Sequence, residues 1–240
     1  MPEQLFISDL HLSAANPEVV ARFEAFAADR AAGASALYIL GDLFDAWIGD
    51  DDDSDVAVRV RRVLAGLTAR GVAVYVQHGN RDFLIGERFC ARTGVELLPE
   101  TAVAEVAGEP TVLMHGDLLC TDDTDYQQAR AMLRNPAFIA EFLARPLAER
   151  AALAAEYRRR SGEATSLKAE DIMDVNADAV SGLLREQGVR RLIHGHTHRQ
   201  GRHGFVLDGV PVSRLVLGEW HPARGSALVD DGSELRFETA

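Results

Sequence analysis

Aspartate, asparagine and histidine side chains recur in five short groups along the chain. Carboxylate oxygens, amide oxygens and imidazole nitrogens together suit divalent ions such as Mn²⁺, Fe²⁺ and Zn²⁺. One such group carries little information, but five groups, each directly after an apolar run, predict a metal site. The groups are Asp9 with His11, Gly41-Asp42, Gly79-Asn80-Arg81-Asp82, His115-Gly116-Asp117 and Gly195-His196-Thr197-His198.

The apolar runs before these groups are predicted to be strands. Runs at residues 5–7, 36–40 and 72–76 alternate with helical patterns at 17–32 and 55–70. This alternation indicates parallel strands that are buried on both faces. Because the ends of neighbouring strands meet at one edge of such a sheet, we expect the five groups to converge there.

Hairpin patterns dominate the remainder of the chain. Apolar runs at 103–106 and 111–114 flank a Gly-Glu-Pro turn, and Asp208-Gly209 and Asp231-Gly232 each separate two further apolar runs. Together with the strand–helix alternation, these hairpins predict an α/β fold with two β-sheets flanked by helices.

Residues 124–168 differ from the rest in composition. They hold eight basic and five acidic residues, a net charge of +3, whereas the remainder carries −15. Asn135-Pro136 is typical of a helix start, and Phe138, Ile139, Phe142 and Leu143 recur at helical spacing. We predict a helical cap inserted into a single domain of residues 1–240.

Length, charge and cysteine content exclude several classes. A chain of 240 residues with 47% apolar residues can bury a proper core, and no run approaches the ~18 apolar residues of a membrane span. The two cysteines, Cys90 and Cys120, cannot build a disulfide framework, so a reducing cytosol is expected. The net charge of −12 disfavours nucleic acid as a partner.

The five groups, in this order, resemble the pattern of the calcineurin-like metallophosphoesterase family over nearly the whole chain. The resemblance implies that family's sandwich of two mixed β-sheets flanked by helices. It also implies two divalent ions, with Mn²⁺ as the usual metal in the nearest members. The ligands that it implies are Asp9, His11 and His198 for one ion, Asn80, His115 and His196 for the other, and Asp42 between them.

Arg81 stands where many family members have a histidine that helps the leaving group depart. An arginine guanidinium is no useful proton donor at ordinary pH, so the leaving group must depart unaided. A phosphate monoester, with a second pKa of ~6, does so, whereas an alkoxide does not. Arg81 therefore favours cleavage of a pyrophosphate. The alternative interpretation is a structural ion pair between Arg81 and Asp82.

Six segments most closely resemble the branch of this family that hydrolyses UDP-2,3-diacylglucosamine in lipid A biosynthesis. They are residues 39–44, 46–51, 78–83, 120–123, 172–176 and 194–199. The resemblance implies water attack on the phosphorus nearer uridine, giving UMP and 2,3-diacylglucosamine 1-phosphate. It assigns catalysis to Asp42, Asn80, Arg81 and His196. The expected location is the cytoplasmic face of the bacterial inner membrane, with peripheral attachment.

The same resemblance implies a substrate-binding set, namely Asn80, Arg81, Asp123, Ser161, Lys168 and His196, with Thr165 where the close family often has asparagine. On a helix, Ser161, Thr165 and Lys168 share one face, although such a stripe is also typical of a solvated face. The cap could hold two acyl chains, or its apolar residues could pack only on one another. Residues 158–160, all arginine, could contact anionic headgroups.

Two other functions remain compatible with the scaffold. One is a different metal-dependent phosphodiesterase or nucleotide pyrophosphatase, including a nuclease, which needs a basic groove that the net charge disfavours. The other is a binding module without metal chemistry, which should lack ligands, and none of the seven is missing here. We expect a monomer that acts on the lipid nucleotide at a membrane surface.

Overall fold

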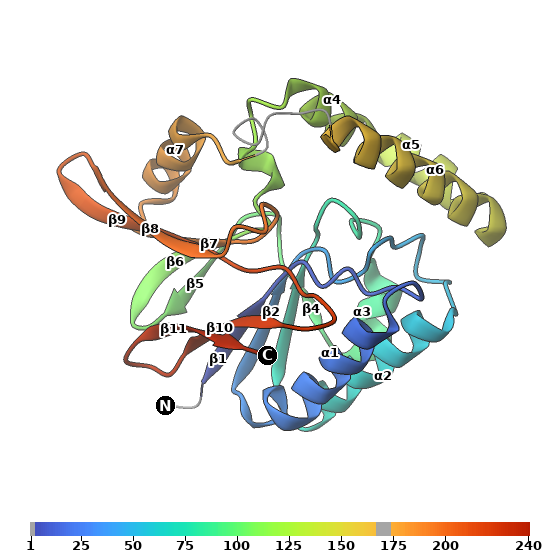
Figure 1. The fold of residues 1–240 in the computed structure, drawn as a ribbon, viewed down its shortest axis with the longest axis horizontal. Coiled ribbons are helices and arrows are strands. Elements are labelled where there is room, and N and C mark those ends of the chain that lie inside the picture. Colours follow the sequence, from blue (N-terminus) through green and yellow to red (C-terminus); the bar gives the residue numbers. More distant parts are fainter. Residues whose placement is uncertain (1–2, 167–173) are drawn as a thin grey trace.

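The computed structural model describes residues 3–166 and 174–240, and for residues 160–166 it describes the backbone only. Two β-sheets form its centre (Figure 1). The first has the order β11-β10-β1-β2-β3-β4 and the second the order β5-β6-β7-β9-β8. The first comprises β1 (Gln4–Ile7), β2 (Ala36–Leu40), β3 (Ala73–Gln77), β4 (Glu96–Leu97), β10 (Ser226–Asp230) and β11 (Leu235–Thr239). The second comprises β5 (Ala102–Val106), β6 (Glu109–Leu113), β7 (Arg191–His194), β8 (Gly201–Leu207) and β9 (Val210–Val216).

The central strands are buried on both faces, as their apolar runs predicted. In β1, Leu5 and Ile7 belong to the core beneath the helices, whereas Phe6 belongs to the core shared with the second sheet. Successive side chains of a strand point to opposite faces, so a run without polar residues satisfies both cores. Strands β1, β2 and β3 are parallel, and so are β6, β7 and β9.

Helices cover the outer face of each sheet. Helices α1 (Pro17–Asp29), α2 (Asp55–Ala69) and α3 (Glu87–Thr93) lie on the first sheet, and α7 (Ala177–Gln187) lies on the second (Figure 1). Two short 3-10 helices, η1 (Ala31–Gly33) and η2 (Asp117–Leu119), lie in the connections that follow α1 and β6. The order helix–sheet–sheet–helix confirms the predicted α/β sandwich.

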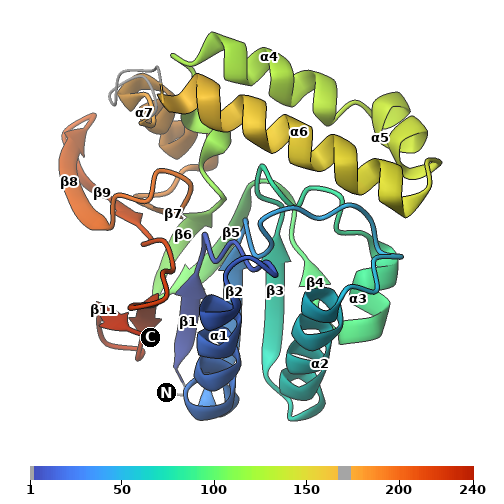
Figure 2. The same ribbon diagram turned by 45° about the vertical axis from the view of Figure 1, so that its right-hand side comes forward.

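Three further helices lie across the carboxyl ends of the parallel strands (Figure 2). This helical layer consists of α4 (Thr124–Leu133), α5 (Pro136–Leu143) and α6 (Leu147–Ser166). The side chain of Asn135 caps α5, and Pro136 occupies its first turn, as the sequence predicted. Of its apolar residues, Phe142 is buried and stacks with Phe138, but Leu143 is exposed.

Some expectations need correction. The helix predicted at 17–32 ends at Asp29, because the chain turns there into η1. Helix α3 and strand β4 had no prediction, since both are short and lack a clear apolar period. The hairpin β8–β9 is longer than its apolar runs indicated, because it projects into solvent and its strands tolerate polar residues. Within residues 3–166 and 174–240, no helix is long and apolar enough to cross a membrane.

Candidate metal centre

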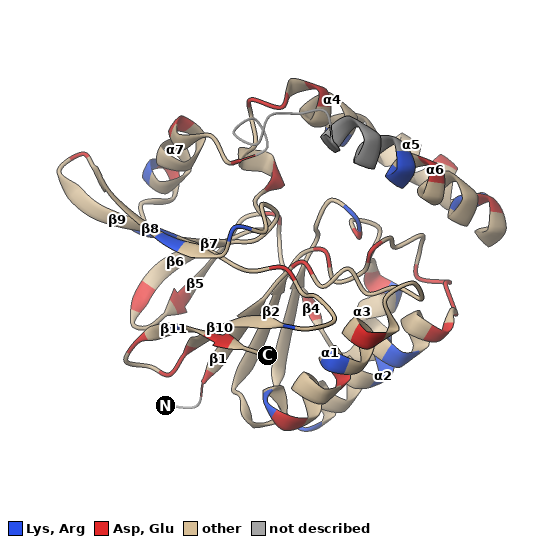
Figure 3. Cartoon of the chain, in the orientation of Figure 1, with Lys and Arg blue, Asp and Glu red and all other residues tan. Residues whose placement is uncertain are grey.

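The five predicted groups meet at one edge of the two sheets. Each lies just past the carboxyl end of a parallel strand: β1, β2, β3, β6 or β7. Backbone hydrogen bonds tie neighbouring loops together, from His11 N to Asp42 O at 3.0 Å and from Gly195 N to His115 O at 2.8 Å. Two further hydrogen bonds, from Arg81 N to Asp42 Oδ1 and from His196 N to Asp9 Oδ2, connect all five loops to one another. Figure 3 shows acidic residues gathered on these loops, below the helical layer.

Five of the seven residues have left-handed backbone conformations. The φ angles are 56° at Asp9, 49° at His11, 52° at Asp42, 68° at His196 and 58° at His198. Non-glycine residues adopt this region uncommonly, and each instance stores strain that the surrounding structure must hold. Such strain concentrates at functional sites. Here the left-handed backbone directs the five side chains toward one another.

The first cluster consists of Asp9, His11 and His198. His198 Nε2 lies 3.3 Å from Asp9 Oδ1 and 3.4 Å from His11 Nε2. The other nitrogen of the same ring, Nδ1, lies 3.1 Å from Glu219 Oε2. Asp9 Oδ2 accepts hydrogen bonds from Ser8 Oγ at 2.6 Å and from the backbone N–H of His196 at 2.9 Å. One face of this cluster is thus fixed by hydrogen bonds, while the donor atoms face a common point.

The second cluster consists of Asn80, His115 and His196. Asn80 Oδ1 lies 2.9 Å from His115 Nε2 and 3.0 Å from His196 Nδ1. His115 Nδ1 lies 2.9 Å from the carbonyl oxygen of Leu40, to which it can donate its proton. With the proton on Nδ1, the lone pair of Nε2 is directed at the cluster and can bind a metal ion.

Asp42 lies between the two clusters. Its Oδ2 is 3.8 Å from His11 Nδ1, and its Oδ1 is 3.7 Å from His115 Nε2. The carboxylate therefore presents one oxygen to each cluster. The carboxylates and histidines of both clusters also form two sets whose donor atoms all lie within 4.8 Å, Asp9–His11–His198 and Asp9–Asp42–His115.

These residues fit a pair of divalent ions on three counts. Donors that share one ion lie about 3–3.5 Å apart, as the atoms of the first cluster do. Two of their buried polar atoms, Asp9 Oδ1 and His11 Nδ1, have no hydrogen-bond partner. Glycines at two positions also allow the backbone of neighbouring loops to approach the carboxylates of Asp42 and Asp9 closely. A Cβ on Gly79 would lie 2.1 Å from Asp42 Oδ1, and one on Gly195 would lie 2.3 Å from Asp9 Oδ2.

Burial controls the protonation of the cluster before any cation is counted. It lowers the pKa of His11 to about 3 and that of His196 to about 4, which keeps both rings neutral. Burial also raises the pKa of Asp42 to about 7, reinforced by Asp82 and Asp9. Burial opposes a charged His198 as well, but its contacts with Asp9 and Glu219 prevail and raise its pKa to about 10. Asp42 is therefore fully ionised at neutral pH only where further positive charge lies nearby, which divalent ions would supply.

Arg81 lies beside this centre, but not in the ion pair that was the alternative interpretation. Its NH1 bonds Asp45 Oδ1 at 3.0 Å, and its Nε lies 3.6 Å from Asp42 Oδ2. Asp82 instead accepts backbone N–H groups of Leu43 and Gly79, both at 2.8 Å. The suggested pair between Arg81 and Asp82 was therefore wrong, since Asp82 is occupied in pinning the two loops.

The remaining predicted substrate residues are less completely placed. Asp123 caps α4, accepting a hydrogen bond from the backbone N–H of Tyr126 at 3.1 Å. Ser161 and Thr165 belong to α6, but their side chains lie outside the part of the chain that the structure describes, and so does all of Lys168.

Sequence reasoning assigned no role to Glu219 or Asp45, and it placed Asp117 in one of the five groups but in no ligand set. Glu219 follows β9 and contacts His198 and, at 3.9 Å, His11 Nε2. Buried Asp117 accepts hydrogen bonds from Arg130 Nε at 2.7 Å and from the Tyr126 hydroxyl at 2.8 Å, which fixes α4 to the loop after β6. Glu219 lies just past a strand, as the five predicted groups do. A single glutamate, however, has no second ligand residue at a characteristic spacing that would mark it as part of a metal site.

Comparisons with known proteins identify the family to which the chain is similar. A family model described as calcineurin-like phosphoesterase matches residues 4–200. A UDP-2,3-diacylglucosamine hydrolase of Cellvibrio japonicus is 49% identical over 217 residues, covering 90% of each chain. A protein of the same name from Stutzerimonas stutzeri is 46% identical and covers 95% of each chain. A solved archaeal phosphodiesterase structure covers 99% of each chain at 12% identity and a TM-score of 0.46, too distant to bear on function.

Proposed function

This chain belongs to the calcineurin-like phosphoesterase family, and we propose that it hydrolyses UDP-2,3-diacylglucosamine to UMP and 2,3-diacylglucosamine 1-phosphate in lipid A biosynthesis. The observation that carries the proposal is the convergence of seven metal-competent side chains at one edge of the sandwich. We propose that the active unit is a monomer.

The proposed cofactors are two Mn²⁺ ions. Asp9, His11 and His198 would hold one, Asn80, His115 and His196 the other, and Asp42 would bridge them, because its two oxygens face different clusters. When bound, such a pair lowers the pKa of a shared water and stabilises charge on the phosphoryl group. Other divalent ions suit the same donors.

The chain's own residues account for the choice of bond. The Arg81 guanidinium, about one-third exposed at the edge of the centre, can hydrogen-bond phosphate oxygens and stabilise the charge that develops on them. It is not suited to protonate a leaving group. A sugar 1-phosphate leaves without that help, since its own oxygens carry the charge. Asn80 and His196 are proposed to contact both metal and substrate.

We further propose that the helical layer is a cap over the substrate's acyl chains, inserted at 124–168 into a single domain. Large apolar side chains of this layer stay exposed: Met132, Leu143, Leu147 and Tyr157. Apolar surface of this kind, beside a site for a lipid nucleotide, supports acyl-chain binding and peripheral attachment to the cytoplasmic face of the inner membrane.

The reaction is tested with chelator-stripped protein, manganese and UDP-2,3-diacylglucosamine in ¹⁸O-labelled water. We expect UMP and the lipid phosphate only when metal is added, with the label in UMP, because water attacks the phosphorus nearer uridine. Label in the lipid phosphate contradicts the direction of attack. Faster turnover of a nucleic acid or another nucleotide diphosphate identifies a different phosphoesterase. Asp42→Asn is the matched inactive control.

The cap is tested with the pair Leu143→Ser and Leu147→Ser. Turnover of the lipid nucleotide is expected to fall, whereas that of a small water-soluble phosphodiester, bis(4-nitrophenyl) phosphate, is expected to stay unchanged. Equal losses on the two substrates mean that the layer does not bind acyl chains.

A further inference from the structure

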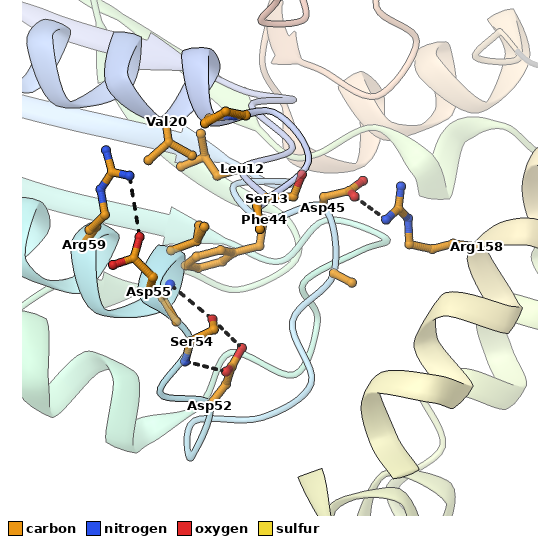
Figure 4. Close-up of a pocket in the computed structure, with 15 residues that line it drawn as sticks. Leu12, Ser13, Val20, Phe44, Asp45, Asp52, Ser54, Asp55, Arg59 and Arg158 are labelled. Carbon is orange, nitrogen blue, oxygen red and sulfur yellow. Dashed lines mark hydrogen bonds and ion pairs between the residues drawn. The ribbon is translucent and has the colours of Figure 1, made fainter. Parts of the chain in front are cut away.

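Asp45 joins the helical layer to the edge of the metal centre. Its Oδ1 accepts a hydrogen bond from Arg81 NH1 at 3.0 Å, and its Oδ2 forms an ion pair with Arg158 of α6. Only 6% of Asp45 is exposed, and it lies beside a cavity of about 340 Å³ between α6 and the starts of α1 and α2 (Figure 4). One buried carboxylate thus serves two guanidinium groups from distant parts of the chain.

The backbone around Arg81 is fixed without the help of this carboxylate. The N–H of Trp47 donates to Arg81 O at 3.0 Å, and the N–H of Arg81 donates to Asp42 Oδ1 at 2.9 Å. The N–H of Asp45 itself donates to Leu12 O at 3.2 Å. A change confined to the Asp45 side chain therefore releases the guanidinium while the loops stay in place.

Two carboxylates compete for the Arg81 guanidinium. Its Nε already lies 3.6 Å from Asp42 Oδ2, the oxygen that faces His11. Without Asp45, the guanidinium would move toward Asp42, whose oxygens are needed at the metal centre. The hydrogen bond to Asp45 holds the guanidinium at the edge of the centre, where its other N–H groups remain available to a phosphate.

We propose that Asp45 is the positioning residue for Arg81, and that Arg158 acts through Asp45 to make this positioning depend on the seating of α6 on the core. The proposal rests on the proposed function, in which Arg81 contacts a phosphate. Arg158 and Arg81 both bind Asp45, so displacement of α6 alters the charge that Arg81 experiences.

The chain offers a matched control in a second contact between α6 and the core. Arg150 donates to the carbonyl oxygen of Ile48 at 2.6 Å and to Asp51 Oδ1 at 2.8 Å. Only 3% of Arg150 is exposed. Asp51→Asn weakens this second contact of α6 but leaves the Arg158–Asp45 ion pair in place, and within the described residues Asp51 pairs with Arg150 and not with Arg81. A difference between these two variants isolates the effect on the guanidinium.

The test compares Asp45→Asn, Arg81→Ala, Arg158→Gln and their pairs in the manganese-loaded, full-length protein. We expect Asp45→Asn to lower kcat about ten- to a hundredfold. In a protein that already carries Arg81→Ala, Asp45→Asn should lower kcat little further, because the effects of residues that act as a unit are not additive. Arg158→Gln should lower kcat less than Asp45→Asn does, and it should not lower kcat further in a protein that already carries Asp45→Asn. Asp51→Asn should change KM for the lipid nucleotide while kcat stays within about twofold.

Three results overturn the proposal. They are a wild-type kcat in Asp45→Asn, a fall in kcat in the double variant Asp45→Asn with Arg81→Ala that equals the product of the two single falls, and a fall in kcat in Asp51→Asn as large as that in Asp45→Asn. Calorimetric binding of inorganic phosphate to the manganese-loaded variants tests the same coupling without turnover. Weaker phosphate binding in Asp45→Asn, not weakened further by Arg81→Ala, supports it even if wild type leaves UDP-2,3-diacylglucosamine intact. In that case the proposed hydrolysis of UDP-2,3-diacylglucosamine is wrong, but the positioning of Arg81 by Asp45 is still supported. Unchanged phosphate affinity in Asp45→Asn contradicts the positioning role of Asp45 and leaves the proposed hydrolysis unaffected.

Discussion

Replacing Glu219 with glutamine is expected to weaken one proposed ion and leave the other unchanged. Glu219 lies 3.1 Å from His198 Nδ1, and His198 Nε2 faces Asp9 and His11. A carboxylate behind a ligating imidazole fixes the tautomer and makes the ring a stronger donor. Within the part of the chain that the structure describes, Glu219 pairs with His198, His11 and His221 but not with Asn80, His115 or His196, so the second ion should keep its affinity.

The size of the effect follows from the lost charge. A hydrogen bond to a charged acceptor contributes about 1.5–3 kcal/mol, and one to a neutral acceptor about 0.5–1.5 kcal/mol. The difference is about 1–1.5 kcal/mol, but 27% of the Glu219 side chain is exposed, which screens part of it. We expect about a three- to tenfold loss of manganese affinity at one site for Glu219→Gln, and a larger loss for Glu219→Ala.

Titration of the chelator-stripped protein with manganese, followed by calorimetry, separates the two binding steps. The control is Glu238→Gln, which changes the same residue type in an ion-paired network with Arg30 and Arg236, away from the centre. Wild-type affinity at both steps in Glu219→Ala, or equal weakening of both, refutes the assignment of Glu219 to His198.

Three further predictions concern the centre and its support. Asp42→Ala should abolish turnover while the thermal unfolding transition is kept, and near-normal activity would remove Asp42 from the bridging role. Gly195→Ala would place a Cβ 1.9 Å from Ser8 Oγ and 2.3 Å from Asp9 Oδ2. It should lower the free energy of unfolding by about 2–4 kcal/mol in urea, whereas Gly204→Ala, with open space around it, should not. Burial opposes ionisation of Asp117, but the charges of His115, His196, Arg130 and Arg134 prevail and lower its pKa below the ordinary 3.8. Its contribution to stability is therefore present above about pH 4 and lost as the pH falls toward the depressed value. The stability of wild type should fall more steeply below pH 4 than that of Asp117→Asn, and parallel acid limbs would contradict this.

The convergence of the five groups could be predicted from the sequence because each group follows a recognisable strand, whereas the family resemblance singled out the seven proposed ligands among them. The runs at 5–7, 36–40 and 72–76, which became β1, β2 and β3, are apolar at every position, and the polar residues that follow within two positions mark the edge of the sheet. Gly79 and Gly195 also show why glycine stands beside these groups, since a Cβ at either position would overlap the carboxylate of Asp42 or Asp9.

Other features had no sequence signal. Left-handed conformations at Asp9, His11 and Asp42 depend on tertiary contacts, since residues other than glycine adopt that region uncommonly, although Asp and His do so more often than most. Asp45 stands in a segment with several other aspartates, and only the fold shows which of them meets both Arg81 and Arg158. The hydrogen bonds that distinguish a positioning carboxylate from a solvated one are formed between segments far apart in the chain.

An anomalous-difference map from crystals grown with manganese would show whether the seven side chains hold two ions. We expect two peaks, one among Asp9, His11 and His198 and one among Asn80, His115 and His196, with a carboxylate oxygen of Asp42 directed at each. A single peak, or peaks away from these side chains, would contradict the proposed metal centre.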